Sequence, residues 1–124
     1  ITIQHLHITT LKPFGDSLIE DALTKIKYGI ITMENHTTVG GLGTCVAELI
    51  AKKGLPKKLI KIAINDTYLH GASRDYLMNE YKINSKELIL AVEKLVKYKL
   101  DLIMNDNINF RKKGFISEAQ PEAL

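Results

Sequence analysis

An acidic residue and a histidine lie two positions apart in the stretch MENHTTVGGLGTCVAEL, which runs from Met33 to Leu49. Glu34 follows an apolar run that is typical of a buried strand, and His36 comes directly before a glycine-rich turn. A histidine that titrates near neutral pH is the usual carrier of protons in catalysis. The pair therefore has two interpretations: an acid–base pair, or two residues that organise the turn or a subunit contact. The second interpretation, a structural or interface role, is favoured over catalysis performed within this chain alone.

The glycines that follow predict a tight connection between a strand and a helix. Gly40, Gly41 and Gly43 permit positive φ angles and a close approach of the backbone to a neighbour. Free N–H groups at a helix start attract anions, so Gly41, Gly43 and Thr44 form a candidate anion site. The stretch lacks the Lys that a phosphate-binding P-loop needs, and Val46 stands where the dinucleotide fingerprint needs its third glycine. A structural turn is therefore the favoured interpretation.

A nucleotide-binding module remains the alternative for the same turn. Asp66 ends a later strand about 20 residues downstream, where a ribose-binding acid is found in dinucleotide-binding folds. In this alternative, the turn at residues 40–43 holds a phosphate and Asp66 holds the ribose.

The remaining candidate groups are isolated. His5 and His7 alternate along a strand pattern and could bind zinc as a pair, but no spacing supplies a third ligand. We therefore predict a polar strand face or a subunit contact there, and no metal site. Cys45 lies in an apolar helix and is interpreted as part of the core rather than as a nucleophile. No catalytic residue is assigned within this chain.

The elements that must position these residues alternate along the chain. Period-two patterns and apolar runs predict strands, 3.6-residue patterns predict helices, and glycine, proline and capping residues separate them. Strands are predicted at residues 1–9, 28–34 and 58–66, and helices at residues 17–27, 44–54, 73–82 and from 85 to about 103. Strands joined by helices indicate an α/β fold with a parallel sheet covered on both faces. We assign residues 1–104 to this domain and residues 105–124 to a C-terminal extension or tail that could add an edge strand.

Composition narrows the function classes. The 124 residues carry a net charge of only +3 and 6% aromatic residues, which argues against a nucleic-acid-binding protein. Five lysines between residues 52 and 61 are interpreted as a solvated surface. No apolar run is long enough to span a membrane. The single cysteine excludes an intrachain disulfide, so we expect a cytoplasmic protein.

Three segments in order resemble the C-terminal domain of transketolase-like, thiamine-diphosphate-dependent enzymes. The marker motif is Glu, a variable residue and His, followed by Gly-Gly-Leu-Gly, and its matching residues here are Glu34, His36, Gly40, Gly41, Leu42 and Gly43. Lys12-Pro13 upstream matches the opening of the family domain, and Asp66, Tyr68 and Tyr81 match its later strand and loop. Lys82 departs from the pattern, since the family often has glycine there. The resemblance is strongest to the small subunit of split transketolases.

The resemblance implies a three-layer α/β/α domain with a mostly parallel five-stranded sheet and one antiparallel strand. It also implies a parent enzyme, expected as a homodimer, that transfers a two-carbon ketol unit between sugar phosphates. Thiamine diphosphate and Mg²⁺ would lie in preceding domains or in another subunit, and none would be bound by this domain. Its own role would be assembly and framing of the active-site region. Deoxyxylulose-phosphate synthase and the β subunit of 2-oxoacid dehydrogenases are alternative parents.

Overall fold

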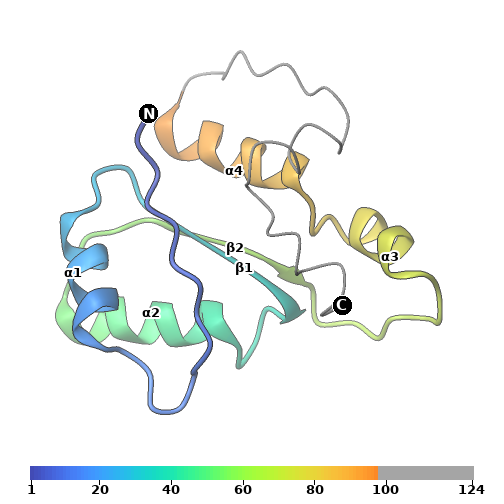
Figure 1. The fold of residues 1–124 in the computed structure, drawn as a ribbon, viewed down its shortest axis with the longest axis horizontal. Coiled ribbons are helices and arrows are strands. Elements are labelled where there is room, and N and C mark those ends of the chain that lie inside the picture. The colour runs from blue at the N-terminus through green and yellow to red at the C-terminus, as the bar shows by residue number, and fades with distance from the viewer. Residues whose placement is uncertain (98–124) are drawn as a thin grey trace.

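The computed structural model describes residues 1–97, which form an α/β domain of short elements (Figure 1). The elements are α1 (Ser17–Lys25), β1 (Ile30–Thr37), α2 (Leu42–Lys53), β2 (Leu59–Ile64), α3 (Arg74–Glu80) and α4 (Ser85–Val96). The predicted extension at residues 105–124, and the predicted end of the last helix near residue 103, lie outside the described residues.

Two parallel strands form the centre of the described domain, and helices cover both of their faces. β1 and β2 pair in parallel, with Ile30 opposite Leu59 and Met33 opposite Ile62. In Figure 1, α2 lies below the strands with α1 beside it at the left, and α4 lies above the strands. This layering confirms the α/β class and the parallel pairing that strand–helix alternation predicts.

The strand predicted at residues 1–9 is wrong, because the described residues contain no strand before β1. The apolar residues of this alternating pattern do not share one environment. Leu6 and Ile8 pack against the core, while Ile1 and Ile3 remain 57% and 70% exposed. A strand needs a partner for its backbone hydrogen bonds, and this segment has no described partner, so alternation alone does not make it a strand. The five-stranded sheet is likewise not confirmed, since the described residues form two strands.

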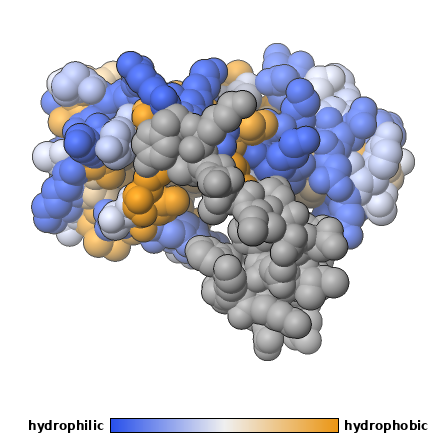
Figure 2. All heavy atoms as spheres, turned by 90° about the horizontal axis from the view of Figure 1, so that it is seen from above, coloured by the Kyte–Doolittle hydropathy of each residue, from blue (hydrophilic) through white to orange (hydrophobic). Residues whose placement is uncertain are grey.

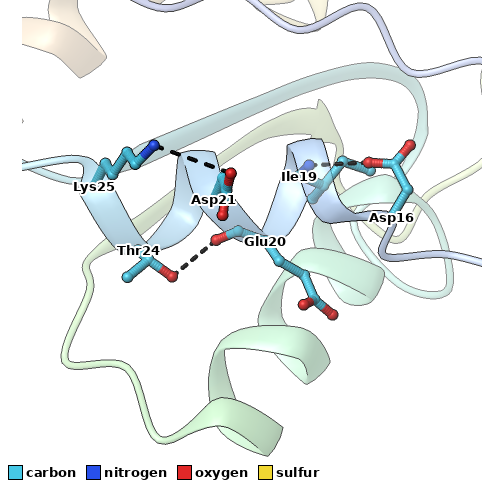
Figure 3. Close-up of polar contacts among 6 residues, drawn as sticks. All are labelled: Asp16, Ile19, Glu20, Asp21, Thr24 and Lys25. Atoms are coloured by element: carbon cyan, nitrogen blue, oxygen red, sulfur yellow. Dashed lines mark hydrogen bonds and ion pairs between the residues drawn. The ribbon is translucent and has the colours of Figure 1, made fainter.

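Helix starts follow the predicted capping residues. The side chain of Asp16 accepts a hydrogen bond from the backbone N–H of Ile19 at 3.0 Å, which satisfies a donor that the first turn of α1 leaves free (Figure 3). Asn84 caps α4 in the same way, accepting from the N–H of Glu87 at 3.0 Å. Both helices begin where the sequence predicts.

Helix ends use the left-handed backbone. Gly54 follows α2 at φ 62°, and the N–H of Leu55 bonds the carbonyl of Ile50 at 3.1 Å. Lys82 follows α3 at φ 61°, and the N–H of Ile83 bonds the carbonyl of Met78 at 2.8 Å. Both are Schellman endings, a motif in which glycine usually takes the left-handed position. Lys82 therefore occupies a position that favours glycine.

The core is divided by the strands into two clusters. Ile19, Leu23 and Val46 are buried between α1, α2 and one face of the strands. Ile62, Ile83 and Ala91 are buried on the other face, beneath α4. Successive residues of each strand point to opposite faces and pack against different clusters, as Ile30 packs against the first cluster and Ile31 against the second. The side chain of Glu34, four residues after Ile30 on the same strand, therefore projects towards α2.

Candidate functional site at the junction of β1 and α2

The Glu34 carboxylate binds the N-terminus of α2. Its Oε2 accepts a hydrogen bond from the backbone N–H of Leu42 at 2.5 Å, and its Oε1 accepts from the N–H of Gly43 at 3.3 Å. Leu42 and Gly43 are the first two residues of the helix, whose early N–H groups have no partner within the helix. A carboxylate placed there also interacts favourably with the positive end of the helix dipole. Glu34 thus caps α2 from a neighbouring element.

The pairing of β1 with β2 becomes irregular after Met33. Between Met33 and Thr37 the strand advances four residues while β2, from Ile62 to Ile64, advances two. The two strands therefore do not stay in simple register over Glu34–His36. Bulges of this kind bend a strand and redirect its side chains. His36 lies within the irregular part, so simple alternation does not place it on the same face as Glu34.

Gly41 lets the carboxylate approach the helix. A Cβ atom at position 41 would lie 2.7 Å from Oε1 of Glu34 and still closer to Oε2, so the carboxylate would have to move away. The requirement at this position is space, because Gly41 has a φ of −101° that any residue can adopt. Gly40, at φ 81°, has the opposite requirement: nothing lies near its missing Cβ, but its backbone is left-handed.

Neighbouring polar groups close the rest of the turn. The hydroxyl of Thr44 accepts a hydrogen bond from the N–H of Gly40 at 2.9 Å and lies 3.4 Å from the carbonyl of Thr38. The ammonium of Lys61 donates to the same Thr38 carbonyl at 3.3 Å. Its aliphatic stem passes beside Gly43, where a Cβ would lie 2.8 Å from its Cδ. The turn is therefore tied to both β2 and α2.

These contacts bear directly on the candidate anion site at Gly41, Gly43 and Thr44. The backbone donor of Gly43 already bonds a carboxylate, as does that of Leu42, and Thr44 is engaged with Gly40. An external phosphate would have to displace Glu34 and would be repelled by its charge at this distance. The helix N-terminus does bind an anion, but the anion belongs to the protein.

His36 is placed apart from this arrangement. Its side chain is exposed, and its Nδ1 lies 3.0 Å from the carbonyl of Thr37. The hydrogen bonds of Glu34 go to Leu42 and Gly43, and those of His36 stay with its neighbour, so the two are not joined as an acid–base pair. Asp66 is exposed just beyond the end of β2. The structure thus brings Glu34, Leu42 and the glycines together, without His36.

The other candidate residues are separate. His5 and His7 are both exposed in the N-terminal segment, and Cys45 is partly buried in the first turn of α2. Within residues 1–97, no three His, Cys, Asp or Glu side chains are grouped so that they could hold a metal ion.

Two features escaped sequence reasoning. Lys61 is exposed, as the sequence predicts for this group of lysines, and its ammonium also bonds the turn. The available signal was its position within an otherwise apolar strand, β2. The second is a set of aromatic rings around the β2–α3 loop. His70 lies edge-on to Tyr76 with centroids 5.9 Å apart, and its Nδ1 lies 3.5 Å from the Tyr81 hydroxyl.

No helix in the described part of the chain combines the length and apolar character needed to cross a bilayer.

Comparison with known proteins gives the motif a family. The model of the family described as "Transketolase, C-terminal domain" matches residues 1–88. A provisionally named transketolase C-terminal section of Methanocaldococcus jannaschii is 35% identical over 88 residues, which cover 71% of this chain and 27% of that protein. The 6-deoxy-6-sulfo-D-fructose transketolase subunit SqwH of Clostridium sp. (strain MSTE9) is 27% identical, over 76% of this chain and 29% of its own.

A 1-deoxy-D-xylulose-5-phosphate synthase of Natranaerobius thermophilus is 36% identical over 80 residues, covering 64% of this chain and 12% of that enzyme. The chain thus spans less than a third of each of these relatives, which are sections, subunits or whole chains of transketolase-type enzymes. The matched residues include the whole β1–α2 junction and the β2–α3 loop. The chain belongs to the transketolase C-terminal domain family.

Proposed function

We propose that this chain is the C-terminal part of an enzyme that transfers a two-carbon ketol unit between sugar phosphates. The parent enzyme uses thiamine diphosphate and Mg²⁺, and supplies their binding residues from preceding domains or from a companion subunit. The cofactor performs the carbanion chemistry when bound. The present domain contributes to assembly, in a cytoplasmic homodimer, and to framing the active-site region.

The observation that supports this proposal is the set of hydrogen bonds made by Glu34, the acidic residue of the family motif. Glu34 is the strongest acid–base candidate in the chain, yet its two oxygens bond the N–H groups of Leu42 and Gly43. A carboxylate held in this way positions a helix against a strand, and both of its oxygens are engaged with the backbone of that helix. The motif therefore supports a scaffolding role, in which the chemistry belongs to other parts of the enzyme.

Cofactor binding and turnover test the proposal. The parent protein is titrated with thiamine diphosphate and Mg²⁺, and ketol transfer is assayed with a ketose phosphate donor and an aldose phosphate acceptor. The matched sample is the chain of residues 1–124 by itself. We expect binding and transfer with the parent only. Tight cofactor binding by residues 1–124 would contradict the division of roles, and a parent without cofactor-dependent transfer would contradict the function.

The second candidate parent is a 1-deoxy-D-xylulose-5-phosphate synthase, because several curated relatives carry that name. The same parent preparation distinguishes the two: formation of 1-deoxy-D-xylulose 5-phosphate favours the synthase, and transfer between two sugar phosphates favours the transketolase. The scaffolding role proposed for Glu34 is the same in both.

A phosphate- or nucleotide-binding module is the remaining alternative, and the occupied helix N-terminus argues against it. Chemical-shift mapping of the chain with phosphate and AMP tests this alternative. Shifts centred on Gly41, Gly43 and Thr44 would support it, while unchanged resonances there would end it.

A further inference from the structure

The connection between β2 and α3, residues 65–73, leaves all of its side chains exposed. Tyr68 is 100% exposed and Leu69 is 38% exposed, and Tyr76 at the start of α3 is 50% exposed. Val39, in the neighbouring β1–α2 turn, is 66% exposed. These four residues, which we call the aromatic edge, follow the carboxyl ends of adjacent parallel strands. The backbone bond from Thr38 N–H to Ile64 C=O, 2.8 Å long, holds the two connections together.

Contacts of His70 and Ser73 hold the base of the aromatic edge in place. His70 packs edge-on against Tyr76 and lies 3.5 Å from the hydroxyl of Tyr81. Ser73 caps α3 by accepting a bond from the N–H of Tyr76 at 3.4 Å. The loop therefore has an anchored base, while Tyr68 points away from every described contact. An anchored loop loses less conformational freedom on binding than a free one, which favours association.

The side chains of the aromatic edge suit a protein–protein interface that combines apolar and polar contacts. Tyrosine offers a large apolar ring together with a hydroxyl, and it is enriched where one protein meets another. The same connection and the start of α3 also carry both signs of charge, in the exposed residues Asp66, Arg74 and Asp75. In Figure 2, the end of the molecule that carries α3 is mostly blue and pale rather than orange, since tyrosines and polar residues dominate it. Such a surface fits a folded protein partner rather than a lipid.

We propose that the aromatic edge is the docking surface for the cofactor-binding part of the parent enzyme. The argument for this occupant is the length of the relatives: the match covers 27% of the Methanocaldococcus protein and 29% of the Clostridium subunit. A domain that is a minor part of its enzyme must present a surface to the remainder. The inference rests on the proposed function and names the residues that make its contact.

A photo-reactive benzoyl-phenylalanine introduced at Tyr68 of the full parent protein, with its companion subunit where one exists, tests the inference. The control is the same group at Tyr28, which is 45% exposed before β1 at the opposite end of the strands. Tyr68 is fully exposed, and Tyr28 is half-exposed with the ammonium of Lys27 5.2 Å from the centre of its ring, so neither substitution removes a residue of the buried core. Cross-linked peptides are then identified by mass spectrometry.

We expect position 68 to cross-link to peptides of the cofactor-binding part and position 28 not to do so. Cross-links to a second copy of this domain, or to residues 98–124, would overturn the inference, as would the absence of cross-links from position 68 or equal yields at both positions. Cofactor-dependent transfer by the unmodified parent is assayed in parallel. Active parent without the expected cross-link rejects the docking surface alone, whereas the expected cross-link on a parent without transfer rejects the proposed function alone.

Discussion

The two connections that follow β1 and β2 occupy equivalent places in the fold and have opposite properties. After β1, residues 38–41 lead into α2, and the side chains of Glu34, Thr44 and Lys61 bond the turn and the helix start within the domain. After β2, residues 65–73 lead into α3 and every side chain is exposed. We call the first connection closed because its polar groups are bonded inwards, although Val39 in it is exposed, and we call the second connection open. Both leave the same edge of the same parallel pair.

This difference shows that a favourable position in an α/β fold does not by itself make a binding site. Ligands in open parallel sheets commonly bind beyond the carboxyl ends of the strands. In this chain a carboxylate of the protein occupies that position at α2, so the helix start serves stability. The neighbouring connection, which lacks such an internal ligand, is free to serve recognition.

Gly41→Ala is the substitution expected to disrupt the closed connection most. The added Cβ displaces the Glu34 carboxylate and breaks its two hydrogen bonds, so we expect a loss of about 3 kcal/mol in the free energy of unfolding. Urea unfolding of the chain measures it. In the Glu34→Ala background the same substitution should cost less than about 1 kcal/mol, because the displaced group is gone. Additive costs in this double-mutant cycle would contradict the proposed contact.

Glu34→Gln tests the charge of the cap with little change in shape. Glutamine keeps one acceptor oxygen for the N–H of Leu42 but loses the second acceptor and the interaction with the helix dipole, so we expect a loss of about 1 kcal/mol. Glu48→Gln, later in α2 and exposed, is the matched control and should be nearly neutral. Equal effects of the two substitutions would remove the distinction between a capping carboxylate and a surface one.

Lys82→Gly addresses the far end of the open connection, where α3 terminates. Lys82 has a left-handed backbone at φ 61°, and glycine adopts this conformation without a steric cost. We expect a gain of about 0.5–1 kcal/mol in the free energy of unfolding, measured by urea titration. Lys58→Gly, at an exposed position preceding β2, is the control and should not stabilise the chain. A destabilised Lys82→Gly chain would show that the lysine side chain has an overlooked contact.

Tyr68→Ser should have the smallest effect on stability. Because its side chain is fully exposed, we expect a change within about 0.5 kcal/mol of zero. Thermal unfolding of residues 1–124 checks this value. A loss comparable with that of Glu34→Gln would mean that the open connection is closed in solution by contacts within the chain.

Much of the fold follows from local signals in the sequence. Asp16 and Asn84 identified the helix starts because a capping side chain bonds the backbone only three residues away. Gly54 identified a helix end for a similarly local reason. The pairing of β1 with β2 follows from the helix between them. Each of these signals lies within one or two turns of the element that it defines.

The remainder depends on contacts between elements. The alternation at residues 1–9 describes which side chains meet the core, but not whether a partner strand is present, and the predicted strand does not form. Glu34 and His36 are equal members of the motif in the sequence, whereas in the structure only Glu34 bonds α2 and the pairing of β1 is irregular before Thr37. The stem of Lys61 beside Gly43 likewise depends on the placement of β2 against α2.

The bond between Glu34 and Leu42 also has a consequence for the order of folding. It joins residues only eight positions apart, so it closes a short ring before any distant segment is needed. Rings of about ten residues close in roughly 10–100 ns, far faster than strands separated by a helix find one another. We therefore expect the end of β1 and the start of α2 to meet before β2 pairs with β1.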